Sequence, residues 1–236
     1  MLPGTGPVRF LALGDSYTIG AGVAAAEDWP AVLVERLRAR GIAIEDPEII
    51  ARTGWTTDEL AAGIERARPR GPYLLVTLLI GVNDQARGAE PDEYRRAFSA
   101  RLRQAVELAG GKPGRVIVLS IPDWSVTPFA ASQDQERIAA TIVRFNQAKR
   151  DQAERRRALR RRDGDLAARG HRSRPVDGLH PSRRMYEAWV EWIMSAALTA
   201  LGHELAPARA HHTASTGTDA QDCISRVWKC FGAVTH

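Results

Sequence analysis

The chain has 236 residues, of which 44% are hydrophobic and 26% are charged, and its formal net charge is +5. This length and composition predict one domain of ordinary α/β size with a sizeable core. The first ten residues do not resemble a secretory signal, and no apolar run approaches the roughly 20 residues of a membrane span, so we expect a cytoplasmic protein without one. Both cysteines, Cys223 and Cys230, lie within the last fourteen residues. That position favours a reducing compartment and leaves a local disulfide open.

Strand-like and helix-like segments alternate along the chain, a pattern typical of a parallel sheet with helices on both faces. The apolar runs that predict strands cover 8–15, 47–54, 73–84 and 115–124. The segments with helical periodicity or helix caps cover 29–40, 56–67, 91–111, 136–156 and 184–201. The run 73–84 is the most apolar, so we expect it in the middle of the sheet. The functional site is expected at the carboxyl ends of the strands.

The alternation breaks after the helix predicted over 136–156, where a doubly wound sheet requires another strand. The interval 157–175 is rich in arginine and has no strand periodicity. From 155 to 174 the net charge is +7, which leaves −2 for the remainder of the chain. Such a run can bind phosphates, but it lacks interleaved aromatic residues, so a solvated insert is favoured and no nucleic-acid partner is expected. We expect the tail over 202–236 to be weakly structured.

Three consecutive predicted strands end in residues suited to acyl transfer. Ser16 follows the first strand on a glycine-flanked turn, where a short side chain lies beside free backbone N–H groups. Such a serine can act as a nucleophile or simply cap a helix. Gly54 ends the second strand with a bare backbone N–H, and Asn83 ends the third with a side-chain amide. Converging donors of this kind form an oxyanion hole, although each residue alone is also typical of a turn or a cap.

A serine hydroxyl needs a base to become a nucleophile. Asp177 and His180 are three residues apart, so in a helix-like turn both side chains fall on one side. The carboxylate can then hold the imidazole Nδ1–H while Nε2 faces the serine. Three aromatic residues that follow strand ends, Trp55, Trp124 and Phe129, are candidates for an apolar pocket.

Four segments together resemble a known family. In chain order, GDSYTIG (14–20), TGW (53–55), GVND (81–84) and DGLHPS (177–182) are similar to the four blocks of the SGNH (GDSL) hydrolase superfamily. The resemblance implies a flavodoxin-like three-layer α/β/α fold with a central parallel sheet, in a domain that covers 1–201. It also implies a serine ester hydrolase that cleaves a carboxylic ester through an acyl-enzyme intermediate.

By the same resemblance, Ser16 is the nucleophile, His180 is the general base and Asp177 is its orienting partner. The oxyanion hole consists of the backbone N–H groups of Ser16 and Gly54 and the side chain of Asn83. No metal or cofactor is implied, the expected partner is a small acyl-ester substrate, and the oligomeric state stays open. The alternatives are a catalytically impaired or noncatalytic protein of this fold, and a nucleic-acid-binding module that uses the arginine run.

Proteins of that superfamily usually place a strand similar to F-V-D-V before the D-x-x-H block, where this chain has the arginine run. The segment LRRRDGDL (159–166) can be encoded by codons that, read one base later, give F-V-D-V-T-A-I. Thirty arginines against three lysines also fit a GC-rich gene, in which alternative frames stay open. We therefore hypothesise that about 157–175 arises from a compensated frameshift, with the last strand of the sheet lost.

Overall fold

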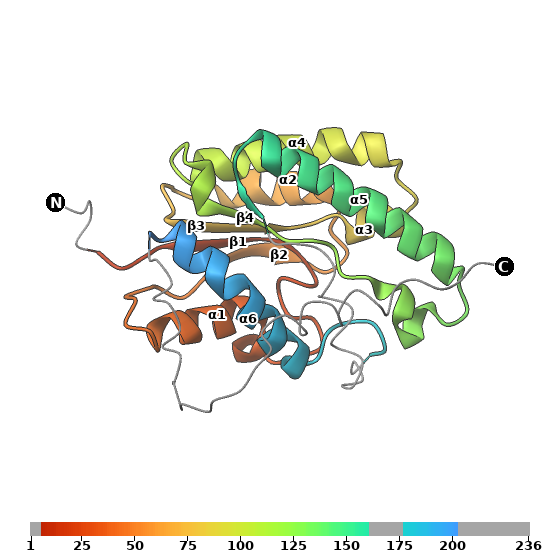
Figure 1. Ribbon diagram of the computed structural model, residues 1–236, viewed down its shortest axis with the longest axis horizontal. Coiled ribbons are helices and arrows are strands. Elements are labelled where there is room, and N and C mark those ends of the chain that lie inside the picture. The colour runs from red at the N-terminus through yellow and green to blue at the C-terminus, as the bar shows by residue number, and fades with distance from the viewer. Residues whose placement is uncertain (1–5, 161–176, 203–236) are drawn as a thin grey trace, which may run out of the picture. The chain divides into compact units, whose positions relative to one another are not determined.

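The computed structural model of the protein describes residues 6–160 and 177–202 (Figure 1). The strands are β1 (Phe10–Asp15), β2 (Glu48–Arg52), β3 (Leu75–Leu79), β4 (Val116–Val118) and β5 (Leu159–Arg160). The α-helices are α1 (Trp29–Arg38), α2 (Thr57–Ala67), α3 (Val82–Ala86), α4 (Pro91–Leu108), α5 (Gln135–Arg155) and α6 (Arg183–Ala200). The predictions for the arginine run beyond 160 and for the tail beyond 202 lie outside the described residues.

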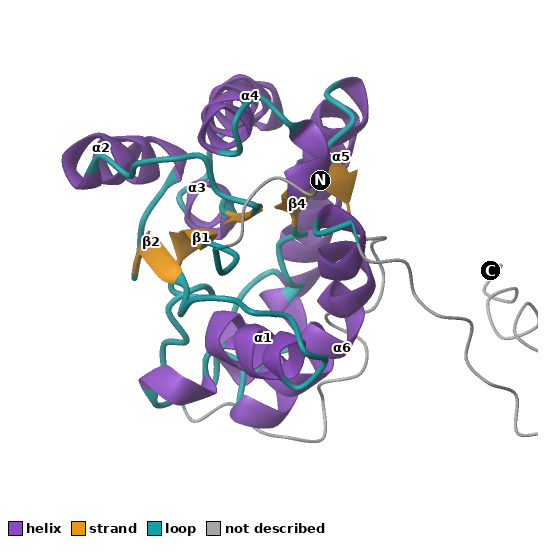
Figure 2. Cartoon of the chain, turned by 90° about the vertical axis from the view of Figure 1, so that its left-hand side faces the viewer, coloured by secondary structure: helices purple, strands orange, loops and turns teal. Residues whose placement is uncertain are grey.

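The five strands run parallel in the order β2-β1-β3-β4-β5. This is the flavodoxin-like order of a doubly wound sheet, in which ligands bind at the carboxyl ends of the strands. Figure 2 shows α2, α3, α4 and α5 on one face of the sheet and α1 and α6 on the other. The predicted three-layer α/β/α architecture with a central parallel sheet is therefore confirmed.

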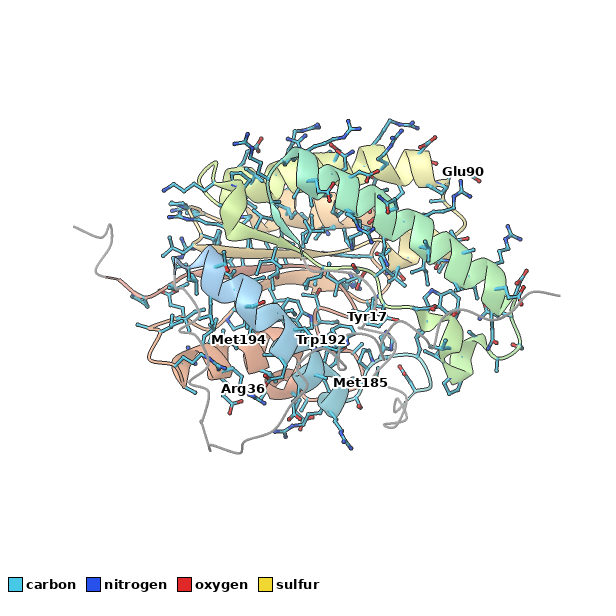
Figure 3. All side chains as sticks on the ribbon, in the orientation of Figure 1. Tyr17, Arg36, Glu90, Met185, Trp192 and Met194 are labelled. Carbon is cyan, nitrogen blue, oxygen red and sulfur yellow. The ribbon has the colours of Figure 1, made fainter. Side chains whose placement is uncertain are left out.

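Both helix layers bury the sheet because its central strands are apolar on both faces. Every residue of β1 and β3 is buried. On one face, Arg36 of α1 pairs with Glu191 of α6, so the two helices are also joined at their solvent-facing side (Figure 3). On the other face, Tyr94 of α4 stacks on Phe145 of α5 with ring centroids 4.3 Å apart. These contacts join the helices of each layer to one another.

The apolar run 73–84 forms two elements rather than one strand. β3 ends at Leu79 and α3 begins at Val82, with Gly81 between them at a φ of +122°. A Cβ on Gly81 would lie 2.4 Å from the Tyr94 hydroxyl, so this turn requires glycine. Asn83 therefore lies in the first turn of a short helix at the carboxyl edge of the sheet.

The arginine run was expected to contain no strand, and the structure corrects this at its beginning. β5 pairs with the edge of β4, with Leu159 opposite Ile117 and Arg160 opposite Val118. Main-chain hydrogen bonds hold a parallel pair together whatever the side chains are, so two residues can pair without apolar alternation. The sheet thus has a fifth strand, of which Leu159 and Arg160 are described.

Candidate active site

Ser16 lies in a tight turn immediately after β1. A Cβ on Gly14 would lie 2.0 Å from Thr18 Oγ1, so the end of the strand needs glycine. The Asp15 carboxylate accepts the Tyr17 N–H over 3.0 Å, and the Asp15 carbonyl accepts the Thr18 N–H over 2.9 Å. These bonds fix the turn and hold Ser16, which is 4% exposed, at the carboxyl edge of the sheet.

The loop between β2 and α2 contains a type II turn with Gly54 at its third position. The Trp55 N–H donates to the Arg52 carbonyl over 3.2 Å, and Gly54 has a φ of +82°. A type II turn needs a positive φ at this position, which glycine adopts without strain. The Gly54 carbonyl accepts a bond of 2.8 Å from Arg87 Nη2.

The helix α3 carries Asn83 and is tied to the same loop. Asn83 Nδ2 donates to the Trp55 carbonyl over 2.9 Å, which uses one of the two N–H groups of the amide. The Asp84 carboxylate accepts the backbone N–H of Thr57 over 3.0 Å and its hydroxyl over 3.1 Å. Burial raises the pKa of Asp84, although the bonds from Thr57 counteract the rise. The loop and α3 therefore form one hydrogen-bonded unit.

His180 and Asp177 form a pair in the turn before α6. His180 Nδ1 lies 2.5 Å from Asp177 Oδ2, and Asp177 Oδ1 accepts the backbone N–H groups of Leu179 over 3.0 Å and of His180 over 2.8 Å. Partial burial raises the pKa of Asp177, but the hydrogen bonds outweigh it and bring the pKa to about 2. The carboxylate is thus ionised at neutral pH and fixes the proton on Nδ1, so Nε2 can accept one.

A cavity of about 160 Å³ joins these elements at the sheet edge. It is lined by Ser16, Tyr17, Thr53, Gly54, Val82, Asn83, Ala86, Trp124, Phe129, Leu179 and His180. Of the predicted aromatic residues, Trp124 and Phe129 line the cavity, with ring centroids 6.0 Å apart. Trp55 does not, because its indole packs against Gly63, where a Cβ would lie 2.3 Å from the ring.

The sequence analysis missed several residues that line this cavity. The Tyr17 ring centroid lies 5.6 Å from that of His180 and 6.1 Å from that of Trp189 in α6. Tyr17 thus lies beside α6, the helix that also carries the labelled Met185 and Trp192 in Figure 3. Tyr17 and Leu179 are direct chain neighbours of residues assigned to the site, and this adjacency was the available signal.

A second cavity, of about 560 Å³, adjoins the first, and Ala86 and Trp124 line both. Trp124 is fixed at this boundary because its Nε1 donates to Gln85 Oε1 over 2.8 Å. Charged and polar side chains contribute to the lining of the larger cavity, namely Glu90, Gln133, Asp134, Arg137, Thr141 and Arg144. The smaller cavity therefore opens beside a polar groove.

Lys149 of α5 is 2% exposed and lies near the Ser16 turn. Its Nζ donates to the Ile80 carbonyl over 3.1 Å. Burial lowers the pKa of Lys149 to about 7, although the charges of Asp15 and Asp84 counteract the fall. Burial also raises the pKa of Asp15 to about 7 against the Tyr17 N–H bond and the Lys149 charge. The sequence analysis missed Lys149.

The described residues contain no group of three or more His, Cys, Asp or Glu side chains placed to hold a metal ion. Within the same residues, no helix is long and apolar enough to cross a membrane.

The model of the GDSL-like lipase/acylhydrolase family matches residues 12–188, a span that includes the whole described site. The chain belongs to this family. A comparison with curated proteins found no match.

Solved structures of several esterases share this fold. The esterase EstA from Pseudoalteromonas sp. is 16% identical, with a TM-score of 0.60 over 83% of this chain and 99% of that one. AlinE4, an SGNH-hydrolase family esterase, is 25% identical, with a TM-score of 0.55 over 84% of this chain and 99% of that one. A variant of Axe2, an acetyl xylan esterase from Geobacillus stearothermophilus, is 18% identical, with a TM-score of 0.60 over 85% and 98%.

Proposed function

We propose that this GDSL-family protein is a serine ester hydrolase that cleaves short-chain carboxylic esters through an acyl-enzyme intermediate. The observation that carries the proposal is one small cavity lined jointly by Ser16, Gly54, Asn83 and His180. These residues would offer one bound ester a nucleophilic hydroxyl, a backbone N–H and a side-chain amide as oxyanion donors, and an imidazole base. Membership of a lipase and acylhydrolase family supports the same class of reaction.

In the proposed mechanism, the Ser16 hydroxyl attacks the ester carbonyl and gives its proton to His180 Nε2. Asp177, held on Nδ1, stabilises the imidazolium that forms. The tetrahedral oxyanion accepts hydrogen bonds from the Ser16 and Gly54 N–H groups and from Asn83, each worth about 2.7–4 kcal/mol in the transition state. His180 then protonates the leaving alcohol, and a water molecule activated by the same base releases the acid from the acyl-enzyme.

The size of the cavity supports a short acyl group. An apolar protein cavity of about 150 Å³ holds one benzene molecule, so about six carbon atoms fill a space of this size. The catalytic cavity has about 160 Å³, and Trp124 and Phe129 contribute to its walls. We therefore propose acyl groups from acetyl to about hexanoyl. The name of Axe2, an acetyl xylan esterase of the same fold, is consistent with small acyl groups of this kind.

A panel of p-nitrophenyl esters tests the proposal. The acetate, butyrate, octanoate and palmitate are compared by kcat/KM for the wild type, for Ser16→Ala and for the control Ser132→Ala, whose serine is exposed outside both cavities. We expect acetate or butyrate to exceed octanoate by at least about 10-fold. Ser16→Ala should abolish turnover, and Ser132→Ala should leave it unchanged. Absence of turnover with every ester, or turnover that survives Ser16→Ala, would contradict the proposal.

A further inference from the structure

Arg87 joins α3 to two parts of the chain next to the cavity. It follows Asn83 by four residues and caps the carboxyl end of α3. Its Nη2 donates to the Gly54 carbonyl over 2.8 Å, and its Nη1 donates to Glu59 Oε2, in the first turn of α2, over 3.2 Å. One guanidinium thus holds both the Gly54 turn and the helix that follows it.

Stability alone does not explain this arrangement. The side chains of Arg87 and Glu59 are 57% and 46% exposed, and ion pairs between such exposed groups contribute about 0–1 kcal/mol. The bond to Gly54 differs, because it is made to the backbone of a residue that lines the catalytic cavity. Arg87 itself is not among the residues that line either of the two cavities. Any effect on the reaction must therefore act through the partners of Arg87, and of Glu59 and Gly54 only Gly54 lines the catalytic cavity.

The same short helix makes two further bonds to this loop. Asn83 Nδ2 donates to the Trp55 carbonyl, and the Asp84 carboxylate accepts from Thr57. Together with Arg87, three side chains of α3 and its cap therefore hold Gly54, Trp55 and Thr57. The loop that carries one expected oxyanion donor is fixed on the helix that carries the other.

We propose that Arg87 is a positioning residue that, by holding the Gly54 carbonyl, keeps the adjoining Gly54 N–H at the correct separation from the Asn83 amide. This inference rests on the proposed function, because only in ester hydrolysis would the Gly54 N–H and the Asn83 amide bind the same oxyanion. Oxyanion donors must lie about 2.7–3.1 Å from the charge that they stabilise. The Gly54 N–H belongs to the Thr53–Gly54 peptide and the Gly54 carbonyl to the next one, so the Arg87 bond acts on the N–H through the Gly54 Cα, where no side chain restricts the backbone. The bond from the Trp55 N–H to the Arg52 carbonyl closes the same turn.

The kinetic test uses Arg87→Ala, Arg87→Lys and a matched control. Arg95→Ala is the control because Arg95 also forms an exposed ion pair, with Asp92 over 3.1 Å, and lines neither cavity. A displacement of about 1 Å costs on the order of 100-fold in rate, so Arg87→Ala should lower kcat by about 10- to 100-fold with little change in KM. Arg87→Lys should retain part of the activity, because lysine donates without the planar fork. Arg95→Ala should leave kcat unchanged.

A double-mutant cycle separates positioning from general damage. If Arg87 acts by aligning Gly54 with Asn83, then Arg87→Ala should cost less than about threefold in kcat when Asn83 is already alanine. If the loss in kcat of the double variant equals the product of the two single losses, Arg87 does not act through the shared oxyanion hole and the proposal is overturned. Thermal unfolding of each variant shows whether a loss of kcat follows from a loss of folded protein.

A measurement independent of turnover completes the test. The order parameter of the Gly54 amide, from ¹⁵N relaxation, should be that of rigid backbone in the wild type and in Arg95→Ala, and should fall in Arg87→Ala. An unchanged Gly54 order parameter in Arg87→Ala would overturn the positioning role, even if esters are hydrolysed. If no ester is hydrolysed and the order parameter still falls, the proposed function fails while the structural action of Arg87 stands.

Discussion

At the scale of single residues, the kinetics of one substitution can distinguish the proposed oxyanion role of Asn83 from a role in substrate binding. One amide N–H is bound to the Trp55 carbonyl, and the other is the expected oxyanion donor. Asn83→Ala should lower kcat by about 100- to 1000-fold with a smaller effect on KM, because the donor acts on developing charge. Steady-state kinetics on p-nitrophenyl acetate measures the two constants. A raised KM with unchanged kcat would assign Asn83 to substrate binding instead.

Single residues also show where sequence reasoning reached its limit. Glycine and polar residues at strand ends could be located because their positions follow from the chain itself, as with Ser16 and Gly54. The direction in which an aromatic ring points could not be predicted in this way. Trp55 was expected in the pocket, but its ring packs against Gly63 of α2. The sequence also offered no reason to select Arg87, because its proposed role depends on a hydrogen bond to Gly54, 33 positions away.

At the scale of elements, β5 lies at the beginning of the arginine run. β5 pairs over two residues with β4, and Asp177 and His180 follow the arginine run directly in the chain. A strand of the usual length at this edge would extend the sheet and anchor the turn that holds the base. The frameshift hypothesis predicts that the DNA across 157–175 encodes such a strand in another frame, which sequencing of the gene checks.

Restoring that strand is the corresponding protein experiment. A variant with RFVDVTAISRRAATDPAL in place of the arginine run should have a higher melting temperature and higher esterase activity, because the longer strand fixes Asp177 and His180. A variant with a glycine-serine segment of equal length serves as the control and should raise neither. If the restored variant melts and reacts like the wild type, the run is a tolerated native insert.

The boundaries of elements were less predictable than their order. The alternation of strands and helices predicted the parallel sheet and its layers, because this pattern depends on many residues at once. The end of β3 instead lies beside Tyr94, whose hydroxyl donates to the Ile80 carbonyl over 2.9 Å and leaves no room for a side chain at Gly81. The chain turns at Gly81, where φ is +122°, and the second half of the apolar run forms α3.

At the scale of the whole molecule, Lys149 links folding stability to pH. Its pKa is about 7 in the folded protein, lowered by burial, and about 10.4 in an unfolded chain. Between these values the unfolded state binds more protons, so the Lys149 contribution to the free energy of unfolding rises with pH. Replacing Lys149 with methionine removes a positive charge that lowers the pKa of Asp15. The pKa of Asp15 should then rise further, and ionising this buried carboxyl at high pH should destabilise the folded variant.

Lys149→Met should therefore lose stability relative to the wild type as the pH rises from about 7 to 10. Urea denaturation of both proteins at pH 7 and pH 9.5 measures the two differences in the free energy of unfolding. Lys112→Met is the matched control, because Lys112 is exposed, and it should show the pH dependence of the wild type. Equal pH dependence of Lys149→Met and wild type would show that Lys149 does not titrate in this range.

The central claim is that Ser16 is the nucleophile of an esterase site, and covalent labelling tests it most directly. A fluorophosphonate probe reacts with an activated serine, and mass spectrometry of the tryptic peptide 10–36 locates the adduct. The account predicts one adduct on Ser16, absent in Ser16→Ala and much slower to form in His180→Ala. Labelling of another residue, or labelling that persists in Ser16→Ala, would contradict it.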